Sequence, residues 1–150
     1  AYMVSQVDIE DAMGHTLDIL AQISGYTSLV AFSGKNEKCF FRGTRFIFEQ
    51  PEFENVNRLK SLFYILEVKM GELQQMLFHY FDENIKFLIG DEIGFEEISD
   101  CSLIVSGARE KELSFALAIL GPMRMDYIRA ASCVCAMKNQ LKKTIEEFLL

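Results

Sequence analysis

The chain has 150 residues, half of them hydrophobic, with 13 Phe and no Trp. This is a usual size for one domain and enough to bury a core without disulfides or metals, so we expect a single folded domain over residues 1–150. The chain contains 15 Lys and Arg residues and 22 Asp and Glu residues, which gives a formal net charge of −7. Such a charge repels a phosphate backbone and argues against direct DNA binding by this chain.

Two features of the sequence concern the cellular compartment. The four cysteines form no C-x-x-C pair, which predicts free thiols in a reducing compartment such as the cytoplasm. The longest strongly apolar stretch, residues 115–120, is too short to cross a bilayer, and no charged-then-apolar signal segment opens the chain. We therefore expect a cytoplasmic protein without membrane contact, and the start at Ala1 indicates a fragment of a longer protein.

The first part of the chain predicts a helix followed by strands. Asp8 can cap that helix, its apolar residues recur at spacings of four and three, and Gly25 can end it. The β-branched and aromatic residues that follow predict strands at residues 26–32, 38–41 and 45–48. Pro51 cannot donate a hydrogen bond to a sheet, so it marks the exit from the last of these strands.

A long helix is the clearest periodic signal in the chain. Its apolar residues alternate by four and three in a heptad-like seam: Leu59, Phe63, Leu66, Met70, Leu73, Leu77 and Tyr80. Such a seam can pack against its copy in a dimer, or it can lie across the domain's own sheet. The second arrangement is favoured, because an amphipathic helix in a mixed domain normally covers a sheet.

The last part of the chain returns to strands and closes with a helix. Strands are expected at residues 85–89, 101–106 and 113–120, with residues 107–111 as a hairpin connection. Gly121 and Pro122 should end the last strand, with Pro122 at the first position of the closing helix. One side of that helix is lined by Ile128, Ala131, Val134, Met137, Leu141, Ile145 and Phe148.

The order of these elements predicts the fold class. We expect an α+β fold with an antiparallel sheet, a long amphipathic helix, and flanking N- and C-terminal helices. Helices on the faces of such a sheet would leave a cup for a ligand.

Residues with catalytic or metal-binding chemistry are few. His15 and His79 lie on separate predicted helices without Cys or carboxylate at metal-ligand spacing, and no nucleophile or phosphate-binding motif is present. We therefore expect no enzyme, no metal and no cofactor. Cys133 and Cys135 point to different sides of a helix, so they are interpreted as small apolar residues.

Arg124 is the charged residue that needs a partner. It falls in the predicted first turn of the closing helix, where the helix dipole disfavours a cation. We hypothesise that it pairs with Asp91, Glu92 or Asp126 and ties the last helix to the turn after strand 85–89; the alternative is an ordinary surface side chain. Apart from such a pair, the acids at residues 91–92 and 96–97 are interpreted as solvated turn carboxylates.

Five segments, in order, are similar to segments of the HrcA repressor family. Residues 20–30 resemble L-x-x-x-S-G-Y-x-x-x-V, residues 43–53 resemble G-x-x-x-x-x-x-Q-P-E-F, residues 85–92 resemble V-x-I-G-x-E, residues 95–104 resemble a segment ending in C-S-L-I, and residues 119–127 resemble G-P-x-R-M-x-Y. Each pattern is weak alone, but the combination is specific. The motif residues, to which we assign structural roles, are Pro51, Glu52, Phe53, Gly90, Glu92, Gly121, Pro122, Arg124, Met125 and Tyr127.

The resemblance implies a GAF-like regulatory domain of a dimeric repressor. It also implies that the whole protein holds heat-shock chaperone genes off by binding an inverted-repeat operator, and that the chaperonin GroEL supports its active state. In the family a winged helix-turn-helix domain holds the DNA, and this chain carries no such domain. We expect the present domain to join the two halves of the repressor and to lose the dimer geometry on heating, which weakens binding to a symmetric operator.

Two departures from the family pattern affect these expectations. Family members carry a long insertion after the Y-x-x-x-V strand that helps to make the dimer, whereas a short turn at residues 33–38 follows here, so a dimer needs another surface. After Tyr127 the family continues V-I-P-L-V, whereas this chain continues I-R-A-A-S-C.

Two other functions remain open at the level of sequence. A GAF-like small-molecule sensor would be favoured by a deep, open apolar pocket and disfavoured by a core filled with Phe side chains. An enzyme would need a cleft that pairs His15 or His79 with a buried carboxylate.

Overall fold

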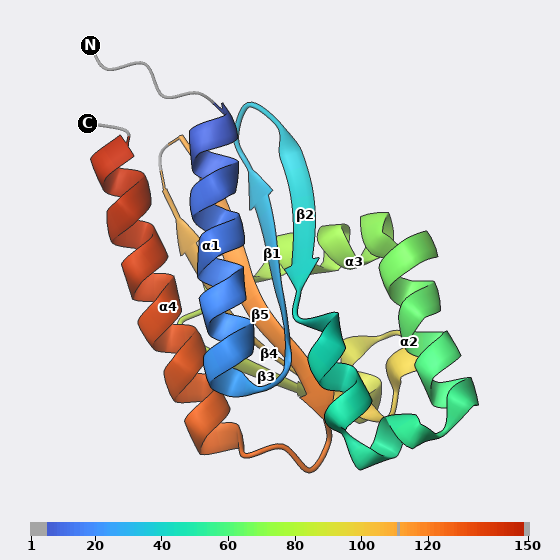
Figure 1. The fold of residues 1–150 in the computed structure, drawn as a ribbon. Coiled ribbons are helices and arrows are strands. Elements are labelled where there is room, and N and C mark those ends of the chain that lie inside the picture. Colours follow the sequence, from blue (N-terminus) through green and yellow to red (C-terminus); the bar gives the residue numbers. More distant parts are fainter. Residues whose placement is uncertain (1–5, 111, 149–150) are drawn as a thin grey trace.

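The computed structural model describes residues 6–110 and 112–148 of the chain (Figure 1). Its centre is a five-stranded antiparallel sheet with the strand order β2-β1-β5-β4-β3. The strands are β1 (Thr27–Ser33), β2 (Glu37–Arg42), β3 (Lys86–Ile89), β4 (Cys101–Arg109) and β5 (Ser114–Pro122). Helices cover both faces of this sheet, so the predicted α+β fold with an antiparallel sheet is confirmed.

The two central strands carry apolar and small residues on both faces. Every residue of β5 is buried, and β4 is buried up to its last residue. Leu103 lies opposite Leu120 and faces one core, while Ile104 lies opposite Ile119 and faces the other. A sheet covered on both sides needs apolar residues at successive positions, which explains why these segments lack polar alternation.

Helices α1 (Gln6–Ser24) and α4 (Tyr127–Phe148) lie side by side on one face of the sheet (Figure 1). Leu17 and Leu20 from α1 meet Val134 and Leu141 from α4 in one buried cluster. The predicted apolar side of the closing helix is wrong at its first position, because Ile128 is 84% exposed and Ala130 takes the buried place. Ile128 therefore projects away from the domain's own core.

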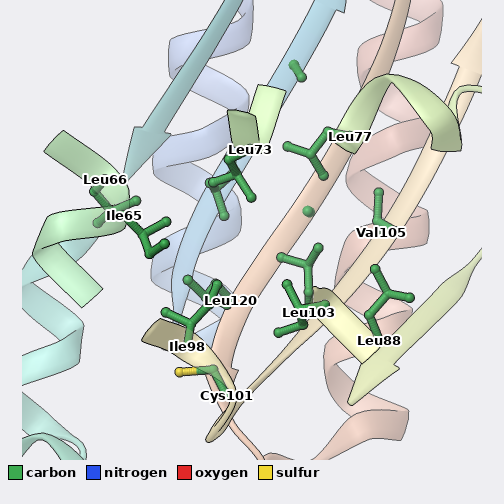
Figure 2. Packing of buried hydrophobic residues seen from close by; sticks show 14 of the residues in the cluster. Ile65, Leu66, Leu73, Leu77, Leu88, Ile98, Cys101, Leu103, Val105 and Leu120 are labelled. Carbon is green, nitrogen blue, oxygen red and sulfur yellow. The ribbon is translucent and has the colours of Figure 1, made fainter. Parts of the chain in front are cut away.

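Helices α2 (Val56–Val68) and α3 (Met70–Leu77) cover the opposite face of the sheet. Figure 2 shows Ile65, Leu66, Leu73 and Leu77 pointing at the strand residues Leu103, Val105 and Leu120. The heptad-like seam is therefore used inside the molecule, as the favoured interpretation had it.

The single long helix predicted over residues 59–80 is broken at Lys69. Its backbone has φ −103° and ψ 19°, outside the helical region, and it serves both as the end of α2 and as the start of α3. A short 3-10 helix, η3 (Phe78–Tyr80), follows α3. Leu66 before the break and Leu73 after it are both buried in the same core against the sheet.

The strand predicted at residues 45–48 is also wrong. The 3-10 helix η1 (Thr44–Glu49) lies there, and a second 3-10 helix, η2 (Pro51–Glu54), follows it. Gly43 has a left-handed backbone with φ +81°, and the N–H of Phe46 donates to its carbonyl, so the chain turns away from β2 immediately. The next segment therefore does not add to the sheet.

Residues 107–109, predicted as part of a hairpin turn, instead continue β4. The chain after η3 crosses β4 at this point, where the N–H of Gly107 donates to the carbonyl of Glu83 at 2.7 Å. A Cβ on Gly107 would lie 2.1 Å from the carbonyl oxygen of Tyr80, so only glycine fits the crossing. The hairpin turn starts beyond Arg109, and Lys111, the last residue of the predicted turn, lies outside the described residues.

Pro122 is the last residue of β5, opposite Cys101, and does not open the closing helix. A turn over residues 123–126 intervenes, held by the N–H of Met125 donating to the carbonyl of Pro122. Helix α4 begins at Tyr127, where the carboxylate of Asp126 accepts from the N–H of Arg129 at 3.2 Å. Met125, within this turn, is buried in the core between the sheet and helices α1 and α4.

Candidate functional site

The five motif segments meet at one end of the sheet. Because the strands are antiparallel, the start of β1 and of β4 lies beside the end of β3 and of β5. The pairs Thr27 with Leu120 and Cys101 with Pro122 fix this end of the sheet. We call the residues gathered there the sheet-end cluster: Tyr26, Gln50, Glu52, Gly90, Glu92, Ser102, Gly121, Arg124, Met125 and Tyr127.

Arg124 joins two motif segments that lie far apart in the sequence. Its Nε lies 2.7 Å from Oε2 of Glu52, and its Nη2 lies 2.8 Å from Oε1 of Glu52 and 2.9 Å from Oε1 of Gln50. The hypothesis that Arg124 has an anionic partner is confirmed, but the partner is Glu52 and none of the three acids expected. The expected geometry was wrong because Arg124 lies in the turn before α4, which directs its side chain towards η2.

Gly121 allows close packing over the end of β5. A Cβ at this position would lie 2.9 Å from the ring of Tyr26 and 3.0 Å from Cε of Met125. Those two side chains come from different motif segments, so Gly121 lets both pack directly on the strand. Phe53, on the other face, is buried in the core beneath α2.

Tyr127 and Ser102 tie the start of α4 to the sheet. Oη of Tyr127 lies 2.8 Å from Oγ of Ser102, and it also donates to the carbonyl of Met123. A phenol has only one proton to donate, so the fully buried Ser102 hydroxyl donates to Tyr127. The rings of Phe87 and Tyr127 pack in an edge-to-face arrangement, with ring centroids 6.1 Å apart.

Glu92 closes the end of β3. Gly90 has φ +62°, and this left-handed turn brings Oε1 of Glu92 to 2.9 Å from the N–H of Ile89. The I-G-x-E pattern therefore has a structural explanation: the glycine makes the turn, and the carboxylate accepts from a strand N–H.

Several contacts in and beside the cluster were not found from the sequence. Gln50 donates through Nε2 to the carbonyl of Gly25 at 3.4 Å, and Arg129 donates to the carbonyls of Ile23 and Ser24 at the end of α1. A basic side chain there satisfies free carbonyls at a helix C-terminus. No sequence signal identified these contacts, because each partner lies in another element.

The space under the cluster is small. The cavity lined by Tyr26, Phe46, Phe53, Leu62 and Gly121, among others, has a volume of about 10 Å³, which is about the room that a single water molecule needs. Aromatic side chains fill the position where the sequence suggested a cup. This counts against a small-molecule ligand in this cavity.

The titratable groups outside the cluster do not assemble a reactive centre in the described part of the chain. His15 and His79 are both exposed, so neither meets the condition set for an enzyme. Burial raises the pKa of the Cys39 and Cys101 thiols to about 12, which keeps them protonated near neutral pH. Within residues 6–110 and 112–148, no group of three or more His, Cys, Asp or Glu is placed to hold a metal ion, and no helix is long and apolar enough to span a membrane.

The family model described as HrcA protein C terminal domain matches residues 30–130. The chain belongs to this family. The match contains the later part of β1, the strands β2 to β5 and the start of α4. It ends near the point where the sequence after Tyr127 departs from the family pattern.

Curated relatives agree with the family match. Proteins named heat-inducible transcription repressor HrcA are 35% identical over 116 residues in Bacillus pumilus, 33% identical over 135 residues in Shouchella clausii and 30% identical over 146 residues in Acetivibrio thermocellus. These alignments cover 75%, 89% and 95% of this chain but 33%, 37% and 41% of the relatives. The chain thus spans between a third and two fifths of the HrcA repressors it matches.

A solved structure shares the fold. The crystal structure of a hypothetical protein superposes with a TM-score of 0.72 and covers 90% of this chain and 69% of that one. At 9% sequence identity this similarity concerns the fold alone.

Proposed function

We propose that this chain is the regulatory and dimerisation domain of a repressor of heat-shock chaperone genes. The whole repressor binds an inverted-repeat operator in the cytoplasm as a homodimer, through a DNA-binding domain outside this chain, and the chaperonin GroEL supports its active form. The observation that carries the proposal is the HrcA family match over residues 30–130, with five motif segments in family order.

The sheet-end cluster supports a structural role for those motifs. Arg124, Tyr127 and Arg129 connect the start of α4 to η2, to β4 and to the end of α1. Most of these contacts are polar and partly exposed, and exposed ion pairs contribute about 0–1 kcal/mol each. An end of the domain held in this way can loosen on heating before the two apolar cores do.

Loosening would have a direct effect on DNA binding. A symmetric operator requires two DNA-binding domains at a fixed spacing, and that spacing depends on the domains that join them. A repressor whose joining domain loosens with temperature therefore releases its operator on heating, and refolding by a chaperonin restores repression.

The proposal is tested by deleting the gene that encodes this chain and measuring chaperone transcripts by quantitative PCR. We expect these transcripts to rise at normal growth temperature and to increase little further on heat shock. The intact gene supplied on a plasmid should restore repression and is the matched control. Chaperone transcripts that stay at the wild-type level in the deletion strain would overturn the proposal.

A further inference from the structure

The segment between β2 and α3 is attached to the domain in a different way from the other helices. It comprises η1, η2 and α2, residues 44–68, and lies beside the sheet at the lower right of Figure 1. We call it the 44–68 flap. Every backbone hydrogen bond that it makes in the described chain stays within residues 43–69. No backbone ladder therefore joins the flap to a strand, and between its two ends only side chains hold it in place.

Helix α2 packs mainly on short elements and not on the sheet. Its main neighbours are η2, α3 and the 3-10 helix η5 (Glu96–Ile98). Helices α1 and α4 instead pack on each other and on strands, α1 on β1 and β2, and α4 on β4 and β5. Among the described residues these two helices expose one large apolar side chain each, Ile23 and Ile128. The flap exposes more of them, at 45% to 62%: Phe48, Val56, Tyr64 and Val68.

Space lies on two sides of the flap. Beneath it is the cavity of about 10 Å³, with Phe53 and Leu62 of the flap on one wall and Cys101 and Gly121 on the other. Between α2 and η5 lies an open cleft of about 410 Å³ with polar and charged lining residues: Asn57, Arg58, Ser61, Glu96, Glu97, Ser99 and Asp100. Water therefore reaches between α2 and the element that supports it while the flap is closed.

Two ion pairs among the described residues connect the flap to elements outside it. Glu52 pairs with Arg124 at 2.7 Å, and Nε of Arg58 lies 3.1 Å from Oδ2 of Asp100. The two arginine side chains are 53% and 47% exposed. Water and salt weaken pairs with this exposure, so they hold the flap closed only modestly.

Non-helical residues border the flap at both ends. Gly43, just before it, has φ +81°, and Lys69, just after it, has φ −103° and ψ 19°. A few residues at the ends of elements are sufficient to absorb the change in φ and ψ when a segment swings. Gly43 and Lys69 therefore provide two pivots.

We propose that the 44–68 flap opens as one unit, at temperatures below the unfolding of the rest of the domain, and that it is the first part to yield to heat. The sheet stays folded in the opened form, because its ladders and its second core with α1 and α4 are independent of the flap. Opening exposes Phe53 and Leu62, and it separates Glu52 from Arg124 in the sheet-end cluster. The inference rests on the proposed function only for the biological use of this opening.

Hydrogen exchange of the purified chain, measured by mass spectrometry of its peptides, tests the opening. We expect amides of α2 to exchange at least about tenfold faster than those in the middle of α1 and α4, at temperatures where circular dichroism shows no loss of structure. Low urea should accelerate exchange less steeply in α2 than in the other two helices, because opening the flap exposes less surface than global unfolding. Amides of α2 that are protected as strongly as those of α1 and α4 would overturn the proposal.

One substitution placed in each core tests whether the flap opens independently. Ile119, on β5, faces the core with α1 and α4, and its contacts persist when the flap opens; Ile65, on α2, is buried beneath the flap. Ile119→Val should therefore accelerate exchange in α4 about three- to tenfold and change exchange in α2 less than about twofold. Ile65→Val, the matched variant, should accelerate exchange in α2 about three- to tenfold.

The same pair of variants defines the contrary result. Equal acceleration of α2 and α4 by Ile119→Val would show that the domain opens only as a whole and would refute the proposal. Circular dichroism checks that both variants are folded. Exchange is measured without DNA and can fail independently of the transcript measurement, so a wrong flap and a wrong function are distinguished.

Discussion

At the scale of single residues, Gly107 has the strictest requirement in the described chain. The backbone of Tyr80 and Phe81 crosses β4 there, and a Cβ would lie 2.1 Å from one carbonyl oxygen and 2.7 Å from the Cα of Phe81. Those neighbours are backbone atoms, so they cannot move aside as the end of a side chain could. The crossing therefore depends on the absence of a side chain.

Replacing Gly107 with Ala should lower the free energy of unfolding by about 3 kcal/mol or more, because overpacking against backbone forces the crossing segment off the sheet. Gly71→Ala is the matched control: nothing lies within 4 Å of a Cβ at Gly71 in α3, and the change should raise stability by up to about 1 kcal/mol. Urea unfolding monitored by circular dichroism measures both. Shifts of the same sign in the two variants would contradict this account.

At the scale of elements, the break between α2 and α3 is joined to the loop before β4. Nζ of Lys69, at the break, lies 2.5 Å from Oε2 of Glu97 in the 3-10 helix η5 (Glu96–Ile98). The hydrogen bond from Lys69 lowers the pKa of Glu97 below its ordinary value of 4.5 and raises the pKa of Lys69 above 10.5. The pair connects the helical layer to the sheet-end side of the molecule.

This pair predicts a pH dependence of stability. A carboxyl with a lowered pKa in the folded state contributes stability above its unfolded pKa and loses that contribution as pH falls through the folded pKa. Glu97→Gln should therefore be less stable than wild type at neutral pH, and the difference should shrink as the pH falls below 4.5.

Urea unfolding at a series of pH values measures the difference between wild type and Glu97→Gln. Glu96→Gln is the control, because the neighbouring Glu96 is exposed and forms no ion pair with a described residue. A stability difference for Glu97→Gln that stays constant from neutral to acid pH would show that the ion pair does not contribute.

At the scale of the whole molecule, the net charge of −7 disfavours binding of the chain to DNA. We expect the chain alone not to shift a duplex with an inverted-repeat operator at physiological salt, since phosphate contacts require clustered Lys and Arg. A gel-shift experiment measures this, with the full-length HrcA repressor of Bacillus pumilus on the same duplex as the positive control. Tight, salt-sensitive binding by the chain alone would contradict the expectation.

Much of the molecule could be predicted from local patterns in the sequence. Met13, Leu17 and Leu20 recur at helical spacing, and residues 115–120 form a run of buried strand residues; the structure places them as expected. Helix periodicity is informative because it depends on neighbours in the sequence and on one buried face, and a strand buried on both faces appears as a continuous apolar run. The five motif segments were likewise sufficient to identify the HrcA family.

The remaining features depend on residues far apart in the chain. The helix breaks at Lys69 although the apolar periodicity continues through it. Another segment crosses β4 at Gly107, and Arg124 meets Glu52 across 72 positions of sequence. A charge in the sequence indicates that a partner is needed, but long-range packing selects which one. The same holds for the sheet-end cluster, whose segments are recognisable one by one and become neighbours because antiparallel pairing brings their ends together.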